Sequence, residues 1–167
     1  MLNENEYLAL LKTRLSHYYD EKPLPNTPEF ALVAELNAAD EGYFIVPNLK
    51  TYSVQHNEYL YVQLFSQELT MDVLAPYLAY MKKAMQNLKT TTEHMSSLFS
   101  LVCICKNGID ADTLAKLCKL RQHKDYCFTL KGWSDLAIFL VDIHAQQLHH
   151  NKAGEKTAAL FKFPQSE

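Results

Sequence analysis

The chain has 167 residues, 48% of them hydrophobic, which is enough for one ordinary domain with a buried core. Its 16 basic and 19 acidic residues give a net charge of −3, so a strongly basic face for nucleic acid is not expected. Because the sequence has neither an apolar run of bilayer length nor a basic leader followed by an apolar stretch, we expect a single cytoplasmic domain over residues 1–167 without membrane contact.

The first third of the chain predicts one helix followed by strands. Asn3 and Glu6 have the spacing of a capping box and predict a helix over Glu4–Tyr19, which Pro23 then prevents from continuing. β-type residues joined by short turns predict three strands, over Phe30–Asn37, Tyr43–Val54 and Glu58–Phe65. Three consecutive strands joined in this way predict an antiparallel meander.

The clearest helical stripe lies in the middle of the chain. Its apolar residues are spaced three and four apart and are Met71, Leu74, Leu78, Met81, Met85 and Leu88. Pro76 lies within this stripe and leaves two alternatives. Either Thr70 caps a short turn and the main helix begins at Pro76, or one continuous helix is kinked there.

Residues 98–143 predict the folding core. Leu98–Lys106 reads as a strand whose run Leu101–Cys105 is apolar on both faces, which is typical of a central strand, and a helix capped by Asp110 follows. Further strands are predicted over Tyr126–Leu130, Leu136–Ile143 and Leu148–Asn151, with a last helix over Gly154–Lys162. The sequence therefore predicts an α+β domain with a mixed, mostly antiparallel sheet and helices packed against it.

The turn between the strands predicted at 126–130 and 136–143 is the main candidate binding site. It carries the only tryptophan, Trp133, flanked by Lys131 and Asp135 and next to a flexible glycine. An exposed indole beside a cation and a carboxylate could present a stacking face with hydrogen-bonding groups. The alternative is an ordinary turn whose tryptophan folds back onto the sheet.

The tyrosines of the predicted meander are the candidate interface. Tyr52, Tyr59 and Tyr61 would form an exposed aromatic sheet face, which is a usual surface for a homodimer.

Other residue groups carry weaker chemical signals. The cysteines Cys103, Cys105, Cys118 and Cys127 lack zinc-knuckle spacing and are interpreted as reduced, buried thiols. The histidines His144, His149 and His150 lie in a polar hairpin, and the sequence around Asp110 is interpreted as a helix cap. No metal and no cofactor is therefore predicted.

The order of helix, three-strand meander, helix, strand, helix and strand resembles that of restriction-endonuclease-like nucleases. Such nucleases carry an Asp near the second strand and an acid-x-Lys on the third, which hold Mg²⁺ and activate water. Here Asp40 and Glu41 precede the second strand, while Glu58 on the third is followed two positions later by Leu60 in place of lysine. The resemblance therefore covers element order and lacks the catalytic lysine.

The C-terminal half also looks like a small family of uncharacterised bacterial proteins. The residues that carry this resemblance are Phe128–Asp135, Val141–Asp142 and Asn151–Gly154. It implies a compact α+β domain and says nothing about activity. The sequence thus favours a non-catalytic binding or protein-interaction module whose partner is an unknown protein or a second copy. The alternative is a divergent metal-dependent hydrolase with Asp40, Glu41 and Glu58 as its carboxylates.

Overall fold

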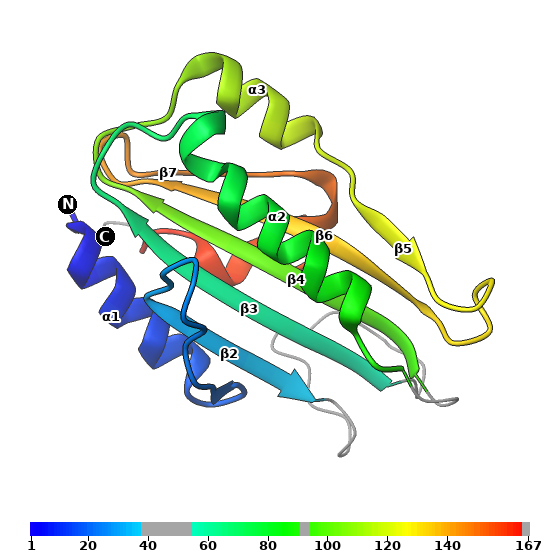
Figure 1. Cartoon of the computed structure of the whole chain (residues 1–167). Helices are drawn as coiled ribbons and strands as arrows, with labels where there is room; N and C mark the ends of the chain where they lie inside the picture. Colours follow the sequence, from blue (N-terminus) through cyan, green and yellow to red (C-terminus); the bar gives the residue numbers. More distant parts are fainter. Residues whose placement is uncertain (38–54, 91–93, 165–167) are drawn as a thin grey trace.

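A computed structural model describes residues 1–37, 55–90 and 94–164 as three helices, two 3₁₀ turns and one mixed sheet (Figure 1). The helices are α1 (Glu4–Leu15), α2 (Met71–Asn87) and α3 (Ala111–Lys119). The strands are β1 (Asp20–Glu21), β2 (Leu32–Asn37), β3 (Gln55–Phe65), β4 (His94–Cys105), β5 (His123–Asp125), β6 (Trp133–Asp142) and β7 (Gln147–His150). The 3₁₀ turns are η1 (Lys152–Gly154) and η2 (Ala158–Phe161). The predicted α+β class is confirmed.

The sheet has the strand order β1-β2-β3-β4-β6-β5, and β7 also pairs with β6. Its long central pairings, β3 with β4 and β4 with β6, are parallel, while the outer pairings are antiparallel. The expectation of a mostly antiparallel sheet is corrected accordingly. The reason is that α2 and α3 act as crossovers, which return the chain to the starting end of the sheet.

The predicted three-strand meander is wrong in its pairing. β2 pairs directly with β3, with Leu32 opposite Val62, so no strand separates them in the sheet. The predicted middle strand, Tyr43–Val54, falls outside the described residues.

Two of the three helices follow their sequence signals closely. Asn3 caps α1 and forms the predicted capping box with Glu6, although the helix ends at Leu15 and not at Tyr19. Asp110 caps α3 by accepting from the backbone N–H of Thr113 at 2.9 Å. For α2 the helix is continuous as in the second alternative, since one helix capped by Thr70 contains Pro76, while the kink at Pro76 stays a prediction.

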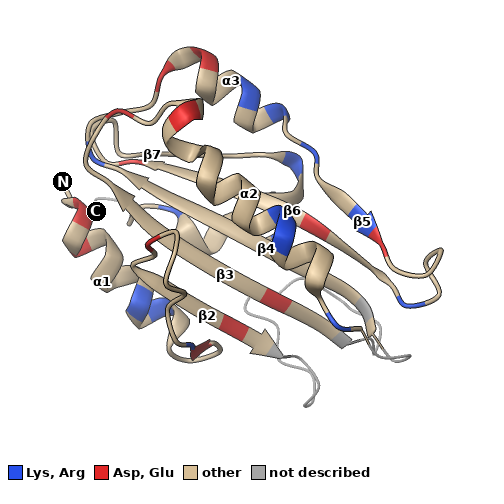
Figure 2. Ribbon diagram, viewed as in Figure 1, with Lys and Arg blue, Asp and Glu red and all other residues tan. Residues whose placement is uncertain are grey.

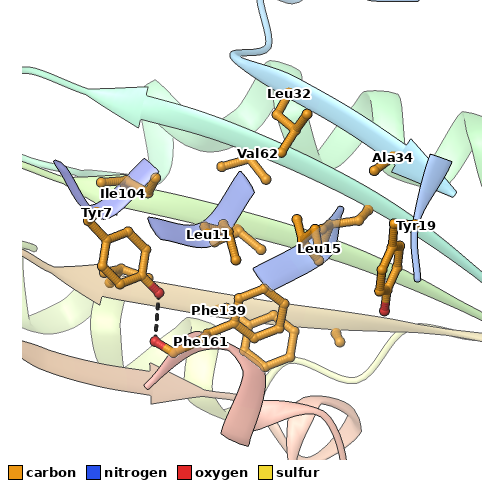
Figure 3. Close-up of a cluster of buried hydrophobic side chains, with 14 of the residues drawn as sticks. Tyr7, Leu11, Leu15, Tyr19, Leu32, Ala34, Val62, Ile104, Phe139 and Phe161 are labelled. Carbon is orange, nitrogen blue, oxygen red and sulfur yellow. Dashed lines mark hydrogen bonds between the residues drawn. The ribbon is translucent and has the colours of Figure 1, made fainter. Parts of the chain in front are cut away.

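The core forms two layers because every long strand is covered on both faces. On one face α1 and the 3₁₀ turns pack against residues such as Val62, Ile104 and Phe139, and the hydroxyl of Tyr7 donates to the carbonyl of Phe161 at 2.6 Å (Figure 3). On the other face α2 and α3 cover Leu101, Ile138 and their neighbours. The run 101–105 is fully buried, as expected for a central strand.

Two predicted elements near the C-terminus are wrong. The predicted strand Tyr126–Leu130 is a loop, because Cys127, Phe128 and Thr129 adopt positive φ angles of 50°, 52° and 70° that no strand can contain. The predicted helix Gly154–Lys162 is replaced by η1 and η2, whose turns are set by tertiary contacts. Among the described helices none has the length and apolarity needed to cross a membrane.

Candidate functional site

The β5–β6 hairpin projects from one end of the sheet (Figure 1) and carries three of the six large hydrophobic side chains that are exposed among the described residues. In its connecting loop, residues 126–132, the side chains of Phe128 and Leu130 are 96% and 82% exposed. Trp133, the first residue of β6, is 37% exposed. We call Phe128, Leu130 and Trp133 the hairpin tip. Large exposed apolar residues gathered in one place are typical of a contact surface.

The loop that carries the tip is held by backbone hydrogen bonds. The N–H of Tyr126 donates to the carbonyl of Gly132 at 2.9 Å, and the N–H of Lys131 donates to the carbonyl of Tyr126 at 3.1 Å. Two tighter turns close inside this frame, from Leu130 to Cys127 and from Gly132 to Thr129. Three successive non-glycine residues with positive φ cost free energy, so the surrounding contacts must maintain this conformation.

Tyr126 ties the loop to the α2 layer. Its buried hydroxyl donates to the carbonyl of Met85 at 2.6 Å and shares a hydrogen bond of 2.8 Å with Ser134 Oγ. Burial raises the pKa of Tyr126, which keeps the hydroxyl protonated and able to donate. The loop is therefore attached to the last turns of α2 at a fixed place.

His94 provides a second attachment. Its Nδ1 lies 2.8 Å from the carbonyl oxygen of Lys131, which can only accept, so Nδ1 carries the proton. Its Nε2 lies 2.7 Å from Ser97 Oγ. The imidazole is 4% exposed and meets the ring of Tyr126 edge-on at 5.8 Å between ring centroids. The carbonyl of Lys131 is thus fixed from inside the protein while the tip remains outside.

We expect Tyr126→Phe to lower the free energy of unfolding by about 1–2 kcal/mol, because the buried carbonyl of Met85 loses its donor. Urea unfolding measures this change. Hydrogen exchange at the amides of Leu130 and Lys131 should also become faster, since both amides donate within the loop. Tyr18→Phe is the control, because Tyr18 is exposed and should leave both quantities unchanged. Equal effects of the two variants would contradict the anchoring role.

The polar part of the hairpin is built around His123. Its Nδ1 lies 2.7 Å from Asp135 Oδ1 on the neighbouring strand, and its Nε2 lies 3.2 Å from Asp125 Oδ1. Figure 2 shows the acidic bands on β5 and β6 beside a basic band on β5. The hydrogen bond with Asp135 raises the pKa of His123, and the bond with Asp125 adds to this effect.

Of the three predicted binding residues, the structure therefore brings only Trp133 and Asp135 together on one face. Trp133 and Asp135 occupy alternate positions of β6 and share the face that α1 covers elsewhere, whereas Lys131 lies in the loop and contributes its carbonyl oxygen to His94. The binding role of Lys131, Trp133 and Asp135 stays a prediction. Sequence reasoning missed Phe128 and Leu130, because their alternation with Thr129 is the pattern of a strand.

The predicted tyrosine interface is partly covered by the chain itself. Tyr59 stacks on Phe99 with ring centroids 4.7 Å apart, and Tyr61 packs against Phe30 and Tyr80 at 5.2 and 5.6 Å. Both tyrosines are half-buried on the α2 face, so the expectation of exposed rings is corrected. Tyr52 falls outside the described residues, and self-association itself stays a prediction.

The carboxylates of the hydrolase alternative do not form a described site. Glu58 is half-buried on β3 and accepts a hydrogen bond from the hydroxyl of Tyr19. Burial raises the pKa of Glu58, against the opposing effect of this hydrogen bond. Asp40 and Glu41 fall outside the described residues. Within residues 1–37, 55–90 and 94–164, no group of three or more His, Cys, Asp or Glu side chains is arranged to hold a metal ion.

The remaining candidates lie apart from one another. Cys103 and Cys105 are buried beneath α2, where burial raises their pKa values. The prediction of buried thiols is wrong for Cys127, which is exposed because the strand predicted there is a loop, and Cys118 on α3 is only half-buried. His144 lies in the exposed turn before β7, whereas His149 and His150 belong to β7 itself.

Comparison with known proteins gives one match. A family model described as a domain of unknown function, DUF8052, matches residues 3–163. No curated protein and no solved structure matches the chain, so no similarity to nucleases is found. The matched region spans both layers of the fold and the whole β5–β6 hairpin. The chain therefore belongs to the DUF8052 family, whose function is unknown.

Proposed function

We propose that the chain is a non-catalytic binding module whose contact element is the hairpin tip and whose partner is another protein. The observation that carries this proposal is the exposure of Phe128 and Leu130 on a loop that is fixed from within. An exposed apolar side chain of this size leaves roughly 1.5–3 kcal/mol of burial free energy unused. A partner with a matching pocket would recover it.

The shape of the tip favours a pocket on the partner and not a flat surface. The three side chains of the hairpin tip cover less than the roughly 800 Å² that each partner buries in a standard protein interface. A few aromatic and aliphatic anchors that enter a pocket supply most of the binding energy in many complexes. Because the attachments through Tyr126 and His94 hold the loop before binding, little conformational entropy is lost on association.

Site-specific photo-crosslinking in the native cell tests this proposal. A photoreactive phenylalanine analogue at position 128 should give a crosslinked band of one discrete mass. The matched control carries the same analogue at Leu24, which is 51% exposed in the connector after α1, far from the hairpin in sequence. A band twice the mass of the chain would identify a second copy as the partner. Identical patterns from both positions, or no protein adduct at position 128, would overturn the proposal.

The absence of chemistry has its own test. Purified protein should hydrolyse neither nucleotides nor short DNA or RNA in the presence of Mg²⁺ or Mn²⁺. A defined turnover that is lost in Glu58→Gln would contradict the binding-module proposal and favour the hydrolase alternative. Tyr19→Phe serves as the matched control, because it removes the hydrogen bond to Glu58 and keeps the carboxylate.

A further inference from the structure

His123 is held between two carboxylates that come from both strands of the hairpin. Asp135 is its direct cross-strand partner on β6, at 2.7 Å from Nδ1, while Asp125 follows two positions later on β5, at 3.2 Å from Nε2. Side chains two positions apart on a strand share a face, so one imidazole reaches both acids. The three groups connect the two strands immediately beside Trp133, which pairs with Asp125.

Counting protons shows which form of His123 this geometry requires. An ionised carboxylate can only accept hydrogen bonds, and neutral imidazole carries a single N–H. The neutral ring could therefore donate to one aspartate while its lone pair faced the oxygen of the other. Only the imidazolium, with protons on both nitrogens, satisfies both contacts. We propose that His123, Asp125 and Asp135 form a proton-operated clamp that closes the β5–β6 hairpin when His123 is protonated and releases it when the proton leaves.

The charges around His123 favour the closed form. The groups that raise its pKa are Asp135 on β6, which acts mainly through its hydrogen bond, and Asp125 on β5, while partial desolvation opposes them. Lys124, the next residue on β5, lies on the opposite face of the strand, where its Nζ is 5.6 Å from the ring centroid of Tyr126. Because both aspartates favour the protonated ring, the clamp holds its proton at a higher pH than a free histidine would.

The sign of the pH dependence follows from the raised pKa. The stabilisation is fully present below the ordinary histidine pKa of about 6.5, which applies to the released state. It is lost as the pH rises through the higher pKa of the closed state. β5 has only three residues, and its other links to β6 are short backbone pairing and the N–H of Leu136 donating to the carbonyl of Gln122 at 3.0 Å, besides the contacts of Tyr126 with Gly132 and Ser134 at the loop end. Loss of the clamp should therefore loosen the strand that leads into the tip.

Fluorescence of Trp133 tests the clamp directly, since this is the only tryptophan of the chain. Titration of the wild-type protein between about pH 5 and 9 should show one transition with a midpoint above 6.5. The transition should vanish in His123→Gln. Its midpoint should fall in Asp135→Asn, and fall less in Asp125→Asn because that contact is longer.

His56→Gln is the matched control. His56 contacts Ser96, which pairs with Trp133, so a titration of His56 could also reach the indole. Burial lowers the pKa of His56, which separates it from the rise in His123. The transition should persist in His56→Gln. A wild-type protein without a transition, or a transition that survives unchanged in His123→Gln, would overturn the clamp.

Control of binding by this clamp rests on the proposed function of the tip, and the two can fail separately. Crosslinking yield from position 128 should be high below the fluorescence midpoint and should drop above it, in permeabilised cells held at each pH. A clear transition without any adduct would refute the binding role and leave the clamp in place. Adducts without a fluorescence transition would refute the clamp and leave the binding role of the tip in place. A transition with equal yields on both sides would show that the clamp does not regulate binding.

Discussion

Asn151→Ala should lower the free energy of unfolding by about 3–5 kcal/mol, more than any other single polar substitution that we predict. The side chain of Asn151 is 1% exposed and makes hydrogen bonds with three backbone groups outside residues 151–154, besides accepting from the N–H of Gly154 at 3.3 Å. Its Oδ1 accepts from the N–H of Ile138 at 3.0 Å, and its Nδ2 donates to the carbonyls of Leu136 at 2.8 Å and Leu120 at 3.0 Å. Alanine would leave all three groups without their partner.

The large loss of stability expected for Asn151→Ala follows from a break in the strand pairing along one edge of β6. On the outer edge of β6, β5 pairs only with residues 133–135 and β7 only with residues 139–142. Between them no described strand pairs with residues 136–138 on this edge. There the N–H of Leu136 donates to the carbonyl of Gln122, the N–H of Asn151 donates to the carbonyl of Ile138, and the side-chain amide of Asn151 takes the place of the missing strand for the remaining groups. Each buried backbone group left unpaired costs about 1–3 kcal/mol, which exceeds the value of a hydrogen bond exchanged with water.

Urea unfolding of Asn151→Ala and of a matched control measures this contribution. Asn107→Ala is the control, because Asn107 donates a single exposed hydrogen bond to the carbonyl of Ser66 and should cost less than about 1 kcal/mol. Asn151→Asp adds a second test. It keeps the size and the acceptor, but replaces the donor to Leu120 and Leu136 with an oxygen. A loss under 1 kcal/mol in both Asn151 variants would contradict the role of a strand substitute.

The sequence predicts those elements whose signals are local. The capping box at Asn3, the cap at Asp110 and the stripe that begins at Met71 each depend on residues within one or two helical turns, and all three helices are present. The apolar run 101–105 correctly predicts a central strand, because burial on both faces leaves no polar position.

The strand order and the conformation of the hairpin loop could not be predicted from local sequence signals. Alternation within β3 and β4 shows that they are strands but does not say that they run parallel, since the pairing depends on how α2 crosses the sheet. In residues 126–130 the strand pattern is overridden by two long-range hydrogen bonds. One joins Tyr126 to Met85 and the other joins His94 to Lys131, and the residues of each pair are far apart in the sequence. The candidate site depends on these long-range contacts.

The C-terminal turns could not be predicted correctly for the same reason. Residues 154–162 contain helix-forming residues, but a helix of nine residues gains little stability by itself, so tertiary contacts decide the outcome. Asn151 caps η1 while its amide enters the gap in the sheet, and the carbonyl of Phe161 receives the hydroxyl of Tyr7. The contacts of Asn151 with β6 and of Phe161 with Tyr7 join residues that are far apart in the sequence.

Gly154→Ala should lower the free energy of unfolding by about 1–3 kcal/mol through overpacking. Gly154 is buried where η1 crosses β6, and a methyl group there would lie 2.8 Å from two ring carbons of Phe139 and 3.3 Å from Cβ of His150. The ring of Phe139 is fully buried and packs on Phe161 with centroids 4.2 Å apart, so it has little room to move.

A double-mutant cycle with Phe139→Leu separates this clash from other causes. Phe139→Leu alone leaves a cavity and is itself destabilising, but it removes the ring carbons that the new methyl group would meet. Gly154→Ala should therefore cost less in the Phe139→Leu background, by about 0.5–3 kcal/mol of coupling. Gly108→Ala is the matched control, since its cost comes from a φ of +84° with no atom within 4 Å of the added Cβ. The effects of Gly108→Ala and Phe139→Leu on the free energy of unfolding should therefore be additive. If Gly154→Ala is also additive with Phe139→Leu, the cost of Gly154→Ala does not come from contact with the Phe139 ring.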